Sequence, residues 1–363
     1  MSILGKLSSL LSTLPPRVKM RLRYVGPEEP VFVIAEIGIN HNGEIETAKK
    51  LIDAAKEAGA DAVKFQKRTT TEILTKEGRD KPYTSPHAYA ATYGEHRDKL
   101  EFSIDQYTEL MRYTRDKGLG FFASVWDHSS ADQMAELGIE AFKIPSADLT
   151  NLPLLEHVAK KNLPILISTG MNTLEEIEDA VHTILQYNNR LIIFHCLSLY
   201  PAPEDKLDMR FMDALAARYA PLPYGYSGHE IDLLPTLVAV SRGAQIVERH
   251  LTLDKTMKGS DHAASLEPNQ FKELVISIRR IEKILGAPEK KLYDELKPLR
   301  EKLAKSVATR VAIPKGTRIE VHMLTVKGPG GGIAPRDMSS LVGRTAQTDI
   351  ADDALVPSEA LTW

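Results

Sequence analysis

Two histidines are candidate ligands for a divalent metal. His229 and His250 lie at, or just beyond, the ends of two consecutive apolar stretches that read as β-strands, and Glu248 and Asp261 are close to them in the sequence. Two imidazoles at adjacent strand ends, with a carboxylate nearby, form an open site that leaves positions for water and substrate. Histidines in loops also serve as plain hydrogen-bonding groups, and spacing alone leaves both interpretations open.

Two lysines interrupt otherwise apolar segments, namely Lys64 and Lys143. A lysine is almost never buried without a partner. Inward-facing ammonium groups, together with the hydroxyls of Ser146, Ser168 and Ser227, predict a pocket for a phosphate or a carboxylate. The alternatives are a lysine that forms a Schiff base with a carbonyl substrate and a lysine on an irregular surface strand.

A carboxylate, Glu36, ends the first of the apolar stretches. It is followed by Ile37-Gly-Ile-Asn-His-Asn-Gly43, whose asparagines and glycines are typical of a tight turn before a helix. At the rim of a site this carboxylate would orient sugar hydroxyls or transfer a proton. An ion pair with a lysine such as Lys64 is the structural alternative, and spacing does not choose between them.

Nearly all of these side chains come at or near the ends of eight apolar segments that the pattern predicts as buried β-strands. Amphipathic helix patterns separate most of the segments, and eight such alternations predict an α/β fold, a parallel sheet closed into a (β/α)8 TIM barrel. In these barrels the carboxyl ends of the strands form the active site. The predicted strands are Val31–Glu36, Ala62–Gln66, Gly120–Ser124, Ala141–Ser146, Pro164–Ser168, Leu191–His195, Pro223–Ser227 and Gln245–His250.

The chain of 363 residues is long enough for one barrel and a smaller second domain. We expect an N-terminal extension over residues 1–27 and the barrel over residues 28–286. Residues 287–305 are charged and lose the strand-helix alternation, which predicts a linker or a connecting helix. Residues 306–363 predict a small β-rich domain, whose own core would need support from the barrel or from a second subunit.

The overall composition excludes several classes of partner. Hydrophobic residues make up 43% of the chain, and no run of 18 apolar residues is present that would span a bilayer. A formal net charge of −3 gives no field for holding nucleic acid or an anionic membrane. The single cysteine, Cys196, excludes an internal disulfide and is typical of a reducing compartment, so we expect a soluble, cytoplasmic protein.

Five motifs resemble the sialic acid (N-acetylneuraminate) synthase family in residues, order and spacing. The resemblance covers about residues 28 to 363, and the segment from Ser306 is similar to the antifreeze-like (SAF) domain that follows the barrel in these synthases. The motifs are Ala35-Glu-Ile-Gly-Ile-Asn-His-Asn-Gly43, Lys64-Phe-Gln66, Ser168-Thr-Gly-Met171, Gly225-Tyr-Ser-Gly-His-Glu230 and Glu248-Arg-His250 through Gly259-Ser-Asp261.

The resemblance implies a metal-dependent condensation of phosphoenolpyruvate with N-acetylmannosamine or its 6-phosphate, giving a nine-carbon 2-keto sugar acid and phosphate. The metal would be Mn²⁺, with Mg²⁺ or Co²⁺ as alternatives. It also implies a domain-swapped homodimer in which each C-terminal domain covers the partner's barrel mouth. A synthase of a legionaminic, pseudaminic or deaminated nonulosonic acid, a Schiff-base aldolase and a non-catalytic carbohydrate-binding or ice-binding protein are the alternatives.

The resemblance further implies roles for individual residues. His229 and His250 would hold the metal, with Glu248 beside it. Asp148 would handle protons or position water, although it is shorter than the glutamate of some members. Ser198 stands in the substrate-binding set where an asparagine is common. The other substrate ligands would be Lys64, Lys143, Ser146, Ser168 and Ser227 for phosphoenolpyruvate, and Glu36, Gln66, Tyr200 and Asp261 for the sugar.

One connection, from Thr69 to Glu101, is unusually long for a compact barrel, which predicts a functional role. It resembles the branch of the family that uses a phosphorylated sugar. Its cations, Lys81, His96, Arg97 and Lys99, would hold a second phosphate or belong to a solvated charged loop.

Overall fold

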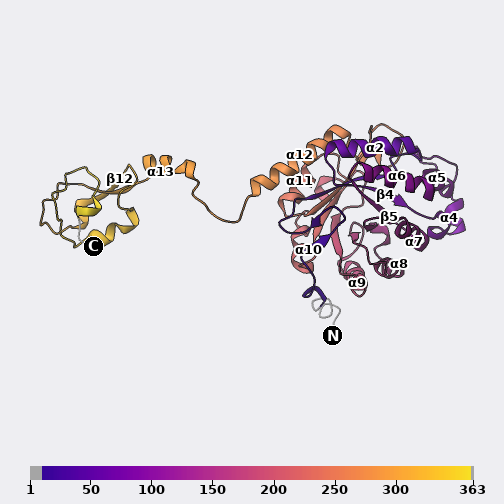
Figure 1. Ribbon diagram of the computed structural model, residues 1–363, viewed down its shortest axis with the longest axis horizontal. Coiled ribbons are helices and arrows are strands. Elements are labelled where there is room, and N and C mark those ends of the chain that lie inside the picture. The colour runs from indigo at the N-terminus through magenta and orange to yellow at the C-terminus, as the bar shows by residue number, and fades with distance from the viewer. Residues whose placement is uncertain (1–9, 361–363) are drawn as a thin grey trace. The chain divides into compact units, whose positions relative to one another are not determined.

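The computed structural model describes residues 10–360, which fall into two compact units, one that ends at Gly286 and one that begins at Ala287 (Figure 1). The first unit contains the barrel and all the candidate site residues. No helix among the described residues is long and apolar enough to cross a membrane.

Eight parallel strands form a closed barrel, which confirms the predicted fold. The first and last strands close it by pairing Ile246 with Phe32 and His250 with Glu36. Each observed strand overlaps the segment predicted for it. The strands are β3 (Phe32–Gly38), β4 (Ala62–Lys67), β5 (Gly120–Val125), β6 (Phe142–Ile144), β7 (Ile165–Ser168), β8 (Leu191–Cys196), β9 (Tyr224–Gly228) and β10 (Ile246–His250).

Amphipathic helices cover the outside of the barrel (Figure 1). In the helix that begins after Thr173, buried Ile177, Val181 and Ile184 recur at helical spacing and face the strands. The barrel helices are α2 (Ile45–Ala58), α6 (Ile104–Asp116), α7 (His128–Leu137), α8 (Leu152–Ala159), α9 (Leu174–Leu185), α10 (Phe211–Tyr219), α11 (Leu234–Ser241) and α12 (Pro268–Leu285).

The long connection between β4 and α6 holds three short helices rather than an open loop. They are α3 (Thr70–Ile73), α4 (Lys76–Asp80) and α5 (Tyr93–Leu100). A capping box between Thr92 and Glu95 fixes the start of α5, because each side chain accepts a hydrogen bond from the other residue's backbone N–H. The side chains of α5, Arg97 among them, therefore project from a helix whose start is fixed.

A short antiparallel hairpin fills the end of the barrel at which the strands begin. It consists of β1 (Val18–Lys19) and β2 (Tyr24–Val25), within the stretch expected as an extension. Its buried side chains share an apolar cluster with Phe32, the first residue of β3. Arg23 ties it to the barrel through an ion pair with Asp61, with Nη2 and Oδ2 2.6 Å apart.

The second unit has an apolar core of its own, which includes Val307, Ile319 and Leu324. Its strands β11 (Ser306–Thr309) and β12 (Leu324–Lys327) pair in antiparallel fashion. Helix α13 (Lys297–Leu303) lies in the segment expected as a linker or connecting helix, and the described helix buries none of its residues.

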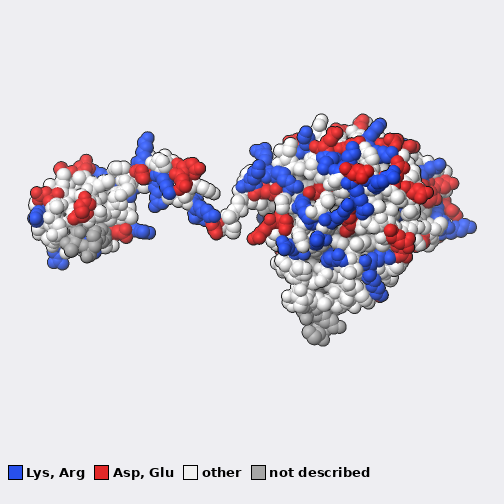
Figure 2. All heavy atoms as spheres, viewed as in Figure 1, with Lys and Arg blue, Asp and Glu red and all other residues white. Residues whose placement is uncertain are grey.

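Acidic and basic side chains are interspersed over the face of the barrel unit seen in Figure 2. That face carries no large area of one sign. The distribution agrees with the small net charge of −3 and offers nothing on this side to attract a polyanion.

Candidate active site

The inward positions of the strands change from apolar to polar along each strand. Inside the barrel, Ile34 is followed two residues later by Glu36, Ala62 by Lys64, and Ile246 by Glu248. Alternate residues of a strand face the same side of a sheet, so each pair lines the interior. The apolar residues of the pairs pack with the hairpin, whereas the polar ones surround a cavity at the carboxyl ends.

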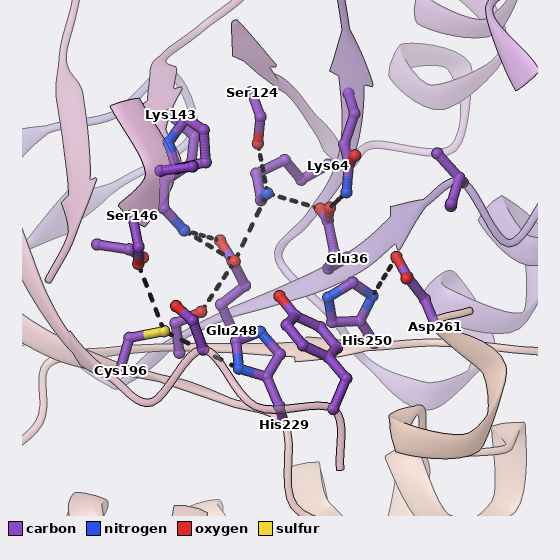
Figure 3. A pocket seen from close by; sticks show the side chains of 18 of the residues that line it. Glu36, Lys64, Ser124, Lys143, Ser146, Cys196, His229, Glu248, His250 and Asp261 are labelled. Carbon is purple, nitrogen blue, oxygen red and sulfur yellow. Dashed lines mark hydrogen bonds and ion pairs between the residues drawn. The ribbon is translucent and has the colours of Figure 1, made fainter. Parts of the chain in front are cut away.

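This main cavity has a volume of about 240 Å³ and brings together thirteen of the fourteen residues proposed from the sequence. Figure 3 shows Lys64, Lys143 and Glu248 among those that point toward one another inside the barrel. The thirteen are Glu36, Lys64, Gln66, Lys143, Ser146, Ser168, Ser198, Tyr200, Ser227, His229, Glu248, His250 and Asp261.

Lys64 is buried against two carboxylates and a hydroxyl. Its Nζ lies 2.8 Å from Glu36 Oε2 and 3.5 Å from Glu248 Oε1, and it donates to Ser124 Oγ over 2.8 Å. Glu36 also accepts a hydrogen bond of 3.0 Å from Gln66 Nε2. The ion pair that was the structural alternative for Glu36 is therefore present, and it holds the carboxylate at the cavity wall.

Lys143 contacts Glu248, the second of the two carboxylates beside Lys64 (Figure 3). Its Nζ lies 2.8 Å and 2.9 Å from the two carboxylate oxygens of Glu248, and Ser227 Oγ donates to Glu248 Oε1 over 3.2 Å. The ammonium also stands 4.7 Å from the ring centroid of Phe194. Glu248 thus links the two lysines.

The two lysines differ in how firmly they hold their protons. Burial acts against the charge of Lys64, but Glu248 and Glu36 outweigh it and raise the lysine pKa above its usual value. For Lys143, burial lowers the pKa by more than the negative charge of Glu248 raises it, and the positive charge of Lys64 lowers it further, so the lysine pKa is below its usual value. Burial opposes ionisation of Glu248 as well, yet Lys143 and Lys64 lower its pKa to about 2, so the carboxylate stays charged.

The serines proposed as substrate ligands also line the main cavity. Ser146 Oγ accepts a hydrogen bond of 2.9 Å from the backbone N–H of Gly170, where a side chain would collide with the Oγ atoms of Ser146 and Ser198. Ser168 Oγ is buried and has no hydrogen-bond partner among the described residues. A buried hydroxyl without a partner is costly, so this oxygen is available to a ligand in the cavity.

The two predicted metal ligands face each other with ring centroids 5.4 Å apart. His229 Nδ1 lies 2.9 Å from the backbone oxygen of Leu197, which places the proton on Nδ1 and leaves Nε2 with a lone pair. Burial, with nearby His250 adding to it, lowers the pKa of His229 to about 3, so the ring is neutral at pH 7. His250 Nδ1 has no hydrogen-bond partner among the described residues and lies 3.8 Å from Asp261 Oδ2.

These features fit an open metal site with two protein ligands. No group of three His, Cys, Asp or Glu side chains suited to a metal occurs in the part of the chain that the structure describes. A metal held by the two imidazoles would keep its remaining positions for water and substrate. Tyr200 closes one side, with its ring 4.1 Å from that of His229.

Asp148 does not line the main cavity. Strand β6 stops at Ile144 before Pro145, and the one-turn helix Ser146–Asp148 directs Asp148 into a neighbouring cavity of about 280 Å³. There it accepts a 3.3 Å hydrogen bond from Asn151 Nδ2. This side cavity shares Arg97 and Trp126 with the main cavity and is lined by Arg68, Glu72, Ile73, Leu74, Tyr93, Arg97, Trp126, Asp148 and Asn151.

Of the four cations proposed in the long connection, Arg97 alone lines either cavity. The side chains of Lys81 and Lys99 are exposed. Burial and the charge of Arg97 lower the pKa of His96 to about 4, so it is neutral. Sequence reasoning missed Arg68, which lies just past β4 and is buried; the signal for it was the change from apolar strand to consecutive cations at Lys67 and Arg68.

Comparison with known proteins identifies the family of the chain. Residues 51–290 match the NeuB family, and residues 304–361 match the SAF domain. The chain is 42% identical to N-acetylneuraminate-9-phosphate synthase of Homo sapiens over 93% of this chain and 94% of that protein. It is 39% identical to N,N'-diacetyllegionaminic acid synthase of Legionella pneumophila over 88% of this chain and 91% of that protein.

A crystal structure of the N-acetylneuraminic acid synthetase of Leptospira borgpetersenii in complex with citrate is also similar. It has a TM-score of 0.69 and 31% sequence identity, and the match covers 78% of this chain and 94% of that one. The chain therefore belongs to the NeuB family of condensing enzymes, the synthases of sialic acid and related nonulosonic acids, and carries a SAF domain after its barrel.

Proposed function

We propose that the enzyme condenses phosphoenolpyruvate with an N-acylmannosamine-type aldose to give a nine-carbon 2-keto sugar acid and phosphate. The observation that carries this proposal is that Lys64 and Lys143 share one cavity with His229 and His250. The ammonium groups suit a small substrate with phosphate and carboxylate groups, and the imidazoles suit a divalent ion.

In this proposal His229 and His250 hold the ion, Mn²⁺ in the first instance and Mg²⁺ or Co²⁺ as alternatives. When bound, such an ion polarises the carbonyl oxygen of the sugar. The neutral imidazole of His229 supports the assignment, since a protonated ring has no lone pair to offer. Glu248 lies beside these residues and keeps both lysines oriented.

The remaining residues bind and orient the two substrates. Lys64 and Lys143, with Ser146, Ser168 and Ser227, hold phosphoenolpyruvate so that its C3 faces the aldehyde. Carbon–carbon bond formation joins C3 to the aldehyde carbon, the aldehyde oxygen takes a proton, water adds at C2, and phosphate leaves. The sugar is oriented by Glu36, Gln66, Ser198, Tyr200 and Asp261.

Proton transfer at the sugar falls to Glu36 in this proposal. Its carboxylate is 1% exposed and lines the main cavity, bonded to Lys64 and Gln66. Asp148, in the side cavity, would act at most through an intervening water.

We further propose that the chain works as a homodimer in which each SAF domain covers the partner's barrel mouth. Apolar side chains near the cavity support this. Met171 and Tyr200 line the cavity and are nevertheless 61% and 48% exposed, and adjacent Leu199 is 44% exposed. A covering domain would remove these surfaces from water.

The test is the release of phosphate from phosphoenolpyruvate with Mn²⁺, run with N-acetylmannosamine and with its 6-phosphate, before and after EDTA. We expect turnover with one of the sugars and its loss after EDTA. Silence with both sugars would redirect the assay to diacetamido or deaminated hexoses, and turnover that resists EDTA would refute the role of the metal.

A Schiff-base aldolase is the rival mechanism, and Lys143 is its sharpest candidate because burial lowers the pKa of this lysine. Treatment with borohydride in the presence of pyruvate would trap a Schiff base as a stable adduct. We expect the mass of the intact protein to stay unchanged, whereas an adduct on a peptide that contains Lys64 or Lys143 would overturn the condensation mechanism.

A further inference from the structure

The side cavity adjoins the main cavity, because Arg97 and Trp126 line both. A ligand that passed between these two residues would reach from one cavity into the other. Gln66 and Glu36, expected at the sugar, belong to the main cavity. The side cavity therefore lies where the end of the sugar remote from its aldehyde would reach.

Arg68 places a buried guanidinium at the side cavity. The residue is 2% exposed, and its Nη1 has no hydrogen-bond partner among the described residues. Its Nη2 donates to Gln66, its Nε lies 3.4 Å from Glu101 Oε1, and its guanidinium stands 4.8 Å from the ring centroid of Trp126. A buried guanidinium nitrogen without an acceptor is costly, and an anionic ligand would remove that cost.

Arg97 adds a second guanidinium from α5. It is half-buried and is held by the hydroxyl of Tyr93, which accepts a hydrogen bond of 3.0 Å from Nε. The phenolic oxygen carries no charge that would neutralise the guanidinium. The charge of Arg97 adds to burial in lowering the pKa of Arg68. Glu101, 3.4 Å from Arg68 Nε, offsets part of this positive charge, and an anionic ligand between the two guanidinium groups would offset more of it.

The two carboxylates of the side cavity do not cancel this pair. Glu72 is exposed and is bonded to the hydroxyl of Ser129. Burial raises the pKa of Asp148, and its carboxyl group accepts from Asn151. Asp148 and Asn151 are suited to hydroxyl groups, and Trp126 offers an apolar face to a sugar carbon chain.

We infer that Arg68 and Arg97 bind a phosphate group at the far end of the acceptor, so that the enzyme uses a hexosamine phosphate in preference to the free sugar. This inference rests on the proposed condensation. Guanidinium groups bind phosphate through paired N–H donors, which a neutral hydroxyl at the same position would leave unfilled.

The kinetic test compares kcat/KM for N-acetylmannosamine 6-phosphate and for N-acetylmannosamine. We expect the wild type to favour the phosphorylated sugar and Arg97→Gln to reduce that preference by about tenfold or more, the usual effect of losing a charged hydrogen bond. Arg68→Lys keeps the positive charge but loses the paired N–H donors of the guanidinium, so it should also reduce the preference for the phosphorylated sugar. Arg112→Gln makes the same change on the exposed face of α6, outside both cavities, and should leave the preference intact.

A binding test separates this inference from the proposed function. In a Trp363→Phe background Trp126 is the single remaining tryptophan of the two in the chain, so its fluorescence reports on the side cavity. Titration with N-acetylmannosamine 6-phosphate, without phosphoenolpyruvate, should change the fluorescence, and Arg97→Gln should weaken that response. Absence of turnover with intact Arg97-dependent binding would reject the proposed reaction alone. Equal use or binding of the two sugars, or an equal effect of Arg97→Gln on both, would overturn the phosphate site.

Discussion

Arg249 and Glu230 form a fully buried ion pair, with Arg249 Nη1 2.7 Å from Glu230 Oε1. Arg249 directly precedes His250 on β10, and Glu230 directly follows His229 after β9. Arg249 Nη1 also donates to Thr236 Oγ1 over 2.9 Å. The pair thus joins, behind the barrel wall, the two strand ends that carry the proposed metal ligands.

Removal of one partner of this pair should destabilise the barrel. Arg249→Met leaves Glu230 buried without its charge partner, which costs about 3–5 kcal/mol of unfolding free energy. Arg242→Met is the matched control, because its pair with Asp213 is partly exposed and should contribute no more than about 1 kcal/mol. The measurement is the urea midpoint of the barrel transition, and equal shifts for the two variants would contradict the prediction.

Replacement of either proposed metal ligand should abolish metal binding without unfolding the protein. For His250→Ala we expect no measurable Mn²⁺ binding by calorimetry and no turnover, since one imidazole with water is a weak site. His182→Ala, on the outer helix α9, should bind Mn²⁺ as the wild type does. If His250→Ala bound Mn²⁺ as tightly as the wild type, His250 would not be a metal ligand.

Loss of the Lys143 ammonium should weaken the binding of phosphoenolpyruvate more than the binding of the sugar. Lys143→Met removes one charged donor and leaves Glu248 paired with Lys64 and Ser227. We expect kcat/KM for phosphoenolpyruvate to fall by about tenfold to a hundredfold, the range for a hydrogen bond to a charged group. Steady-state kinetics at saturating sugar test this, and an unchanged value would exclude Lys143 as a ligand.

Acid should destabilise the folded protein partly through His41. This residue is buried, accepts a 3.0 Å hydrogen bond at Nδ1 from the backbone N–H of Gly43, and has its pKa lowered to about 3 by burial. The unfolded chain takes up the proton near pH 6.5, so stability is complete above that pH and falls as the pH drops towards 3, by about 1.4 kcal/mol per unit. His41→Asn keeps an acceptor for Gly43 but does not titrate, and urea midpoints between pH 7 and pH 5 should fall less steeply for it.

The two units should fold separately and act together. Each has its own apolar core, so a chain truncated after Gly286 should retain a cooperative thermal transition. If the SAF domain covers a partner's barrel, this truncation should also become monomeric in sedimentation and lose most of its turnover. A full-length monomer with full activity would contradict the proposed domain swap.

The fold followed from the sequence because each strand carries its own local signal. Apolar runs such as Leu191–Cys196 and the helix patterns between them depend on neighbours in the chain, and alternation leaves few topologies open. The candidate metal ligands and the two lysines were proposed from the same local signals, the histidines at or just beyond strand ends and the lysines within strands. Their pairing partners were not, because the bond between Lys143 and Glu248 spans 105 positions in the chain.

Two residues of the side cavity, Asp148 and Arg68, could not be placed from the sequence, for one physical reason. Asp148 and Arg68 both follow a strand end, where the direction of a side chain depends on the turn rather than on strand alternation. The helical turn from Ser146 directs Asp148 into the side cavity, and burial of Arg68 depends on Glu101 and Trp126, which come from other elements. Sequence spacing contains neither piece of information.

The hairpin of β1 and β2 has a kinetic consequence. Its side chains Val18, Met20 and Val25 fill the end of the barrel where the strands begin, so ligands reach the main cavity from the opposite end. A compound bound by Lys64 and Lys143 lies below one bound near Tyr200 and Arg97. The sugar binds the free enzyme as well, but it then blocks the way to the deeper site, so turnover should require phosphoenolpyruvate to bind first and an excess of sugar should inhibit competitively with phosphoenolpyruvate.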